Sequence, residues 1–341
     1  MYGSGAASCL LAAPFPGLTK PQTGRLNKSP HTVHEIANRL NFGYTESDYE
    51  EDSMTAENPF LNIRARELFI WLILIYSLCA SVLNMVNVAL PMGNFTMENI
   101  TNCLYFLLVY FLIYRKTKQE NIDIRLFLQR TSNTKWLHLI GLVLCLFLFS
   151  IVSLSLTVKL FVYVWPSLPI SDIASYDLKK SVFSWVVLIL TAVVLGPIVE
   201  EILFRGILLS RWSSKWGMRK AALTSALAFA IPHSDVLGAF LFALCMTILY
   251  LRTKTLLIPI AAHALSNTIA VIKFWGMQDA SVRDTISHFQ SITWVWTLCL
   301  AATSLILVTY IYRHWPKKGA LSPYSLRMNE RSASIEILPA G

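Results

Sequence analysis

Long apolar runs dominate the chain from residue 68 onward, and short polar segments separate them. A helix needs about 20 apolar residues to cross a bilayer. The pattern therefore predicts an all-α, polytopic membrane helix bundle of about eight transmembrane helices, of which roughly two are short. We expect these helices near residues 68–90, 98–114, 137–165, 181–210, 219–233, 236–251, 256–275 and 293–312. The helices near 219–233 and 236–251 should form a tight hairpin that need not cross fully.

The composition agrees with a membrane protein, because 55% of the 341 residues are hydrophobic and only 14% are charged. In a soluble protein the net charge of +9 would suggest a nucleic-acid partner, but here Lys and Arg cluster between the apolar runs. Such clusters mark cytoplasmic segments of membrane proteins. We therefore expect membrane lipids and no nucleic acid as partners, and both termini in the cytoplasm. The basic segments contain Arg64, Arg66, Arg115, Lys116, Lys118, Arg125, Arg130, Lys135, Arg211, Lys215, Arg219, Lys220, Arg252, Lys254, Arg313, Lys317 and Lys318, whereas Lys179, Lys180, Lys273 and Arg283 fall on the predicted outer side.

Three parts of the chain differ in composition. Residues 1–66 are polar, rich in proline and acidic near residues 46–52, a composition too poor in apolar side chains to form a core. We expect them to be a disordered cytoplasmic tail. Residues 67–315 form the predicted transmembrane helical domain, and 316–341 a cytoplasmic C-terminal tail. The six cysteines include no CxxC pair, so no disulfide framework is predicted.

A charged cluster interrupts the apolar run that starts near Ser181. Glu200, Glu201 and Arg205 lie within this run, where a carboxylate costs about 2.5 kcal/mol or more. Glu201 and Arg205 are four residues apart and share one helix face, whereas Glu200 is rotated by about 100° from Glu201. We therefore expect Arg205 to pair with Glu201. An unpaired buried carboxylate at Glu200 suits a general base or acid.

Two histidines are the other ionisable groups of note at membrane depth. His263 lies four residues before Asn267, so one helix face presents an imidazole and an amide that can both donate to one oxyanion. His233 follows Phe229 by four residues, and the phenyl ring should pack one turn back and fix the imidazole. At about 1.5 Å per residue, the cluster lies roughly 10 to 17 Å below the cytoplasmic surface. We expect a polar cavity that opens toward the cytosol.

Prolines accompany each of these polar sites. Pro197 precedes the glutamates, Pro232 precedes His233 and Pro259 precedes His263. Proline removes a helical hydrogen bond and clashes with the preceding turn. Kinks at these three positions could shape the predicted cavity.

The residues of the cluster fit three motifs in order. Residues 200–205 read EEILFR and fit EExxxR, residues 229–233 read FAIPH and fit FxxxH, and residues 263–267 read HALSN and fit HxxxN. Over residues 181–275 the chain resembles the CPBP intramembrane proteases, which include the type II CAAX prenyl endopeptidases and the Abi-like bacteriocin-processing and self-immunity proteins. The resemblance implies hydrolysis of a peptide bond within the membrane. The substrate would be a peptide or protein that is prenylated or membrane-embedded.

The resemblance also implies a role for each motif residue. Glu200 with His233 would activate the attacking water, His263 and Asn267 would stabilise the oxyanion, and Glu201 with Arg205 would support the site. The family is often described as metalloproteases, and a zinc ion would have to gather Glu200, His233 and His263 from three helices. We expect a metal-independent glutamate mechanism and no cofactor. The alternative functions are a non-catalytic membrane scaffold or immunity factor with the same fold, and a transporter or proton relay.

Overall fold

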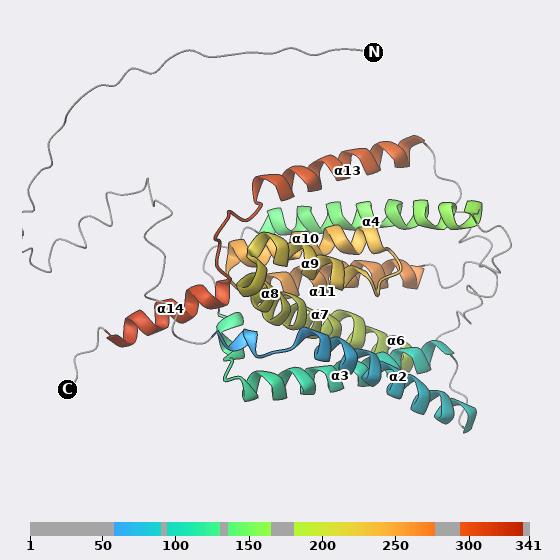
Figure 1. Cartoon of the computed structure of the whole chain (residues 1–341). Coiled ribbons are helices and arrows are strands. Elements are labelled where there is room, and N and C mark those ends of the chain that lie inside the picture. The colour runs from blue at the N-terminus through green and yellow to red at the C-terminus, as the bar shows by residue number, and fades with distance from the viewer. Residues whose placement is uncertain (1–57, 90–93, 130–135, 165–180, 277–293, 337–341) are drawn as a thin grey trace, which may run out of the picture. The chain divides into compact units, whose positions relative to one another are not determined.

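The structure is a computed structural model that describes residues 58–89, 94–129, 136–164, 181–276 and 294–336 (Figure 1). Within these ranges the chain is helical and has no strand, which confirms the predicted all-α class. Most of the predicted N-terminal tail lies outside the described residues.

Within the described ranges, seven helices are long and apolar enough to cross a membrane, which supports a multi-pass integral membrane protein. They belong to α2 (Ala65–Ala89), α3 (Asn94–Gln119), α4 (Trp136–Val164), a central helix (Val182–Trp216), α10 (Val236–Thr253), α11 (Leu257–Gly276) and α13 (Trp294–Arg313). The short span expected near 219–233 does not cross the bilayer, in agreement with a hairpin that need not cross fully. It is α9 (Met218–Ala230), whose 13 residues reach only about 20 Å, less than the roughly 30 Å of a bilayer core.

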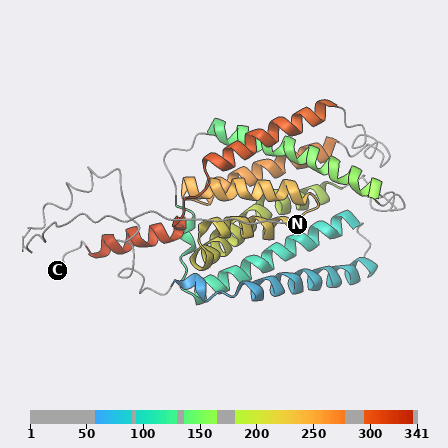
Figure 2. The same ribbon diagram turned by 45° about the horizontal axis from the view of Figure 1, so that its top comes forward.

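The helices of the bundle pack in three groups (Figures 1 and 2). α2 pairs with α3 along one side, and α4 pairs with α13 along the other. The central helix lies between these pairs with α9, α10 and α11, which contact one another. α2 and α13 expose most of their apolar side chains, as lipid-facing helices do. The charged motifs lie on other helices, in the inner group.

The central helix is continuous from Val182 to Trp216 but contains two π-helical segments. It consists of α6 (Val182–Ile189), the π-helical η4 (Leu190–Leu195), α7 (Gly196–Glu201), the π-helical η5 (Ile202–Leu208) and α8 (Leu209–Trp216). It ends at Gly217, whose positive φ of 77° starts the sharp turn into α9. π-Helical segments are frequent at functional sites, and here they flank the pair Glu200 and Glu201.

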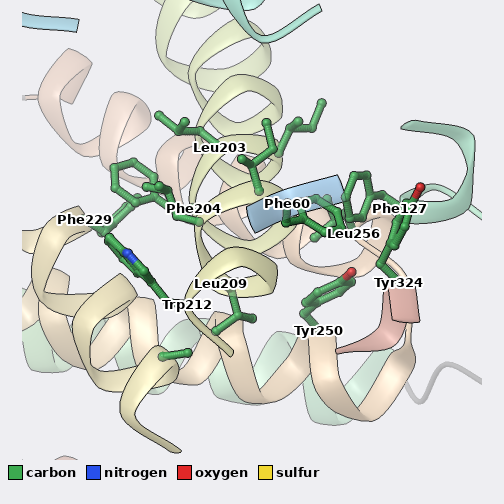
Figure 3. Close-up of a cluster of buried hydrophobic side chains, with 14 of the residues drawn as sticks. Phe60, Phe127, Leu203, Phe204, Leu209, Trp212, Phe229, Tyr250, Leu256 and Tyr324 are labelled. Carbon is green, nitrogen blue, oxygen red and sulfur yellow. The ribbon is translucent and has the colours of Figure 1, made fainter. Parts of the chain in front are cut away.

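The basic segments meet at one end of the bundle, where short connections hold the helices together. Arg211 donates to the carbonyls of Phe60 and Leu61, and the backbone N–H of Leu256 donates to the carbonyl of Phe127. Figure 3 shows Phe60, Phe127 and Tyr324 lying together in the buried cluster at this end. Tyr324 belongs to α14 (Pro323–Glu336) in the predicted C-terminal tail, and Phe60 lies in the predicted N-terminal tail. A part of each predicted tail therefore packs in the core, and the disorder expected for residues 1–66 is wrong for residues 58–66.

Candidate active site

Glu201 and Arg205 form a fully buried ion pair at the centre of the site. Arg205 Nη1 lies 3.1 Å from Glu201 Oε1, and the two residues are 1% and 0% exposed. Arg205 also donates from Nη2 to the carbonyl of Ala243 at 3.4 Å, and its guanidinium lies 4.5 Å above the Phe229 ring. The structure thereby confirms the pairing predicted from the four-residue spacing. Both charges are compensated inside the protein.

His263 joins the helix α11 to both glutamates. Its Nδ1 lies 2.9 Å from Glu201 Oε1, and its Nε2 lies 3.7 Å from Glu200 Oε2. The Phe242 ring meets the imidazole edge to face, with 4.9 Å between the ring centroids. His263 is therefore held on one side by a carboxylate and on another by an aromatic ring, and its second nitrogen faces Glu200.

Glu200 differs from its neighbour in accessibility. Its side chain is 21% exposed, whereas that of Glu201 is 0% exposed. The difference follows from helix geometry, because consecutive residues are rotated by about 100°. Of the two adjacent carboxylates, Glu200 is the one that a water molecule or a substrate can reach.

His233 lies in the turn that follows α9 and is only partly buried. Its Nδ1 is 2.7 Å from the carbonyl oxygen of Phe229, and its ring stacks on the Phe229 ring at 4.5 Å and 23°. This confirms the predicted packing of Phe229 one turn back. The contact with the carbonyl engages Nδ1 and leaves Nε2 as the nitrogen for chemistry.

Asn267 fills a gap in the hydrogen bonding of the central helix. Its amide donates to the carbonyl of Ala192 at 2.7 Å. In this part of η4 the register is five residues, since the N–H of Gly196 donates to the carbonyl of Thr191. The same register would pair Ala192 with Pro197, which has no N–H. The Asn267 side chain supplies the missing donor and keeps a second N–H for another acceptor.

The three motif prolines have different structural effects. Pro197 lies inside the central helix, next to the change of register. Pro232 follows the end of α9 at Ala230, and Pro259 lies in the first turn of α11. The kinks predicted at three positions therefore reduce to one interruption within a helix, because proline fits without loss in a first turn or after a helix end.

Several contacts of the site could not be found from the sequence. Phe229 touches Arg205, His233 and His263, although the motif suggested only its packing on His233. The carbonyls of Ala192 and Ala243 are backbone groups, and Phe242 is one of many phenylalanines in apolar helices. The sequence carries no signal for these contacts. The polar cavity expected around the cluster stays a prediction.

The arrangement does not fit the metal site considered from the sequence. Among the described residues, no group of three or more His, Cys, Asp or Glu side chains is placed to hold a metal ion, and this includes Glu200, His233 and His263. The Nδ1 atom of His263 bonds to Glu201, which is not one of the three residues considered as zinc ligands.

Comparisons with known proteins support the class that the fold and site define, a multi-pass membrane protein with a buried Glu, His and Arg cluster. Residues 182–269 match the family model described as type II CAAX prenyl endopeptidase Rce1-like. Over this segment the chain is similar to the type II CAAX prenyl endopeptidases, in agreement with the resemblance to the CPBP intramembrane proteases that the three motifs carry. All seven residues that the three motifs specify fall inside this segment.

Two curated relatives each match about a quarter of the chain. A protein of Bacillus subtilis (strain 168) named "Putative membrane peptidase YdiL" is 36% identical over 88 residues, which are 25% of this chain and 36% of the relative. An uncharacterised 24.3 kDa protein of Escherichia coli is 32% identical over 101 residues, 27% of this chain and 46% of the relative. The matched segment thus spans less than half of either relative. No solved structure matches the chain.

Proposed function

We propose that this protein is an intramembrane endopeptidase of the CAAX-protease type, in which Glu200 and His233 activate a water molecule for attack on a peptide bond. The observation that carries the proposal is the contrast within the cluster. Glu200 is accessible, whereas Glu201, Arg205 and His263 around it are buried and fixed by one another. A reactive carboxylate held beside fixed charges is what general-base catalysis requires.

In the first step Glu200 accepts a proton from water while the oxygen attacks the carbonyl carbon of the substrate. His233 orients this water through Nε2, because its Nδ1 is engaged by the carbonyl of Phe229. When the tetrahedral intermediate collapses, Glu200 returns the proton to the departing amine. The carboxylate therefore acts first as base and then as acid, and no atom or charge is left over.

His263 and Asn267 stabilise the oxyanion of the intermediate. Because Nδ1 of His263 faces Glu201, donation from Nε2 requires that the imidazole carry both protons. The charges of Glu200, Glu201, Arg205 and His263 then cancel, which suits a site within a bilayer. Asn267 contributes the N–H that its bond to Ala192 leaves free. Glu201 and Arg205 hold His263 in place.

The substrate is a peptide or protein with a prenylated or membrane-embedded end, and it enters from the side of the basic segments. These segments gather at one end of the bundle, which we assign to the cytoplasm by the positive-inside rule. Both termini then lie in the cytoplasm, and the site opens to that side.

A metal-independent reaction is part of the proposal, since the described donor set is not arranged around a common centre. The purified protein should contain no stoichiometric zinc by elemental analysis. Its activity should survive dialysis against a chelator. Activity that is lost on chelation and restored by zinc would replace the glutamate mechanism with a metal-dependent one.

The experiment that tests the function compares membranes from cells that express the wild-type protein or Glu200→Gln. New C-terminal fragments in the membrane proteome should appear with the wild type and be absent with the variant. Glu98→Gln is the matched control, because Glu98 is an exposed glutamate on α3 that belongs to none of the three motifs. If Glu200→Gln yields the same fragments, or if its cells keep the wild-type phenotype without cleavage, the non-catalytic scaffold becomes the better account.

A further inference from the structure

A second buried carboxylate, Asp235, lies outside the three motifs. It precedes α10 and is 8% exposed. Its Oδ2 accepts the hydroxyl of Ser150 at 2.7 Å, and its Oδ1 accepts the hydroxyl of Ser153 at 2.8 Å and the backbone N–H of Gly238 at 3.0 Å. Three donors therefore bind one carboxylate, and two of them come from α4, which the family match does not cover.

Asp235 is the part of the α9–α10 turn that is fixed inside the bundle. Of residues 231–237 it alone is buried, and its neighbours Ile231, Val236 and Leu237 are 67%, 47% and 57% exposed. The turn therefore has few apolar contacts of its own, and its attachment to α4 depends on polar bonds. Segments with so few buried contacts open locally at low cost unless they are tied down.

The space around Asp235 also shows that the network is closely fitted. A Cβ atom at Gly238 would collide with the Asp235 carboxylate and would lie 3.0 Å from the Ser150 hydroxyl. The glycine lets the start of α10 approach α4 closely enough for both serines to reach one side chain. Ser150 and Ser153 are three residues apart, so they lie on the same face of α4.

His233 lies between Phe229 in α9, which its ring contacts, and Asp235, which follows it by two residues. We propose that Asp235, Ser150 and Ser153 form a positioning network that holds the α9–α10 turn against α4 and so keeps His233 at the distance from Glu200 that catalysis needs. The proposal rests on the proposed function, in which His233 orients the water.

The kinetic test uses the double variant Ser150→Ala/Ser153→Ala in the full-length purified protein. Its control is Ser155→Ala, because Ser155 is a buried serine of the same helix whose hydroxyl bonds only within α4, to the carbonyl of Ile151. A displacement of about 1 Å costs on the order of 100-fold in rate, so kcat should fall 10- to 100-fold in the double variant while KM changes little. The control should keep both constants.

A second pair of variants separates the hydrogen bonds of Asp235 from its negative charge. Asp235→Asn retains an oxygen for the N–H of Gly238 and hydrogen-bonding atoms for both serines, so it should keep kcat within about threefold of the wild type. Asp235→Ala removes all three bonds and should lose as much as the double serine variant. A merely structural role would lower the yield of folded protein but leave kcat per folded molecule unchanged.

Labelling of His233 by diethyl pyrocarbonate, followed by mass spectrometry, tests the network without any peptidase assay. Loss of the two hydroxyls should raise the labelling rate of His233 severalfold and leave that of His263 unchanged, whereas Ser155→Ala should match the wild type. Unchanged labelling of His233 in the double variant, or an unchanged kcat, would overturn the positioning role. If the double variant does not fold, Ser150→Ala alone is measured in the same way. An inactive wild-type protein would refute the proposed function, and the labelling would still decide the network.

Discussion

Two buried carboxylates in this bundle are held in opposite ways. Glu201 contacts ionisable side chains, the Arg205 guanidinium at 3.1 Å and the His263 imidazole at 2.9 Å. Among the described residues, Asp235 accepts hydrogen bonds from uncharged donors, two serine hydroxyls and one backbone N–H. Bonds from hydroxyl groups satisfy a carboxylate without adding a charge, whereas an ion pair requires both partners to remain in place. The first arrangement suits a site where charge develops, and the second suits a joint between helices.

Glu200 is held less tightly than either of these two carboxylates. It lies next to Glu201 in the chain, yet its ion-pair partner among the described residues, His263, is 3.7 Å away and its side chain is partly exposed. Glu201 is held through Oε1 by Arg205 and His263, and Asp235 is held by three donors, whereas the partly exposed Glu200 is available to react. In our account the two fixed carboxylates each orient a histidine, Glu201 by direct contact and Asp235 through the turn.

The largest expected effect comes from breaking the charged cluster. Arg205→Ala should lower the free energy of unfolding by about 3–5 kcal/mol, because it leaves Glu201 buried without its partner. Denaturation of the purified protein in detergent, followed by circular dichroism, measures this change. The double variant Glu201→Leu/Arg205→Met should regain most of the stability but remain inactive, since His263 loses its carboxylate. A double variant as unstable as Arg205→Ala would show that charge compensation is not what stabilises this region.

A smaller effect is expected from crowding the Asp235 region. Gly238→Ala places a methyl group against the carboxylate, and overpacking of this kind costs about 1–3 kcal/mol. Gly141→Ala is the matched control on α4, since a Cβ there meets nothing within 4 Å, and it should be neutral or stabilising. The same denaturation assay compares the two. Equal stabilities would mean that the turn does not depend on close contact with α4.

The smallest effect concerns the bond between the two helices that carry the motifs. Asn267→Ala removes the donor to the Ala192 carbonyl and, because this bond is only partly buried, should cost about 0.5–1.5 kcal/mol. In a Pro197→Ala background the restored backbone N–H can serve the same carbonyl, so the cost of Asn267→Ala should become smaller. A double-mutant cycle measures this coupling. Additive effects would show that Asn267 does not substitute for the proline's missing donor.

Local spacing explains which parts of the site the sequence predicts well. Glu201 with Arg205, and Phe229 with His233, are four residues apart, and helical geometry alone places such pairs in contact. The motifs also identified the matched family and the helices that carry the site. The predicted hairpin of α9 and α10 is present, although α9 is too short to cross.

Contacts between distant helices could not be predicted in this way. The bridge from His263 to both glutamates depends on how α11 packs against α7, and the bond from Asn267 depends on a change of register in η4. Ser150 and Ser153 appear in the sequence as ordinary serines of an apolar helix. Their role becomes visible only when α4 and the α9–α10 turn are placed side by side.

The most direct test of the account is the turnover of purified Glu200→Gln on a substrate that the wild-type protein cleaves, such as a farnesylated CAAX peptide if it is accepted. General-base catalysis contributes about 100- to 10,000-fold, so the variant should lose at least 100-fold in kcat while its thermal unfolding stays close to that of the wild type. A Glu200→Gln protein that retains the wild-type kcat would contradict the central claim that Glu200 activates the attacking water.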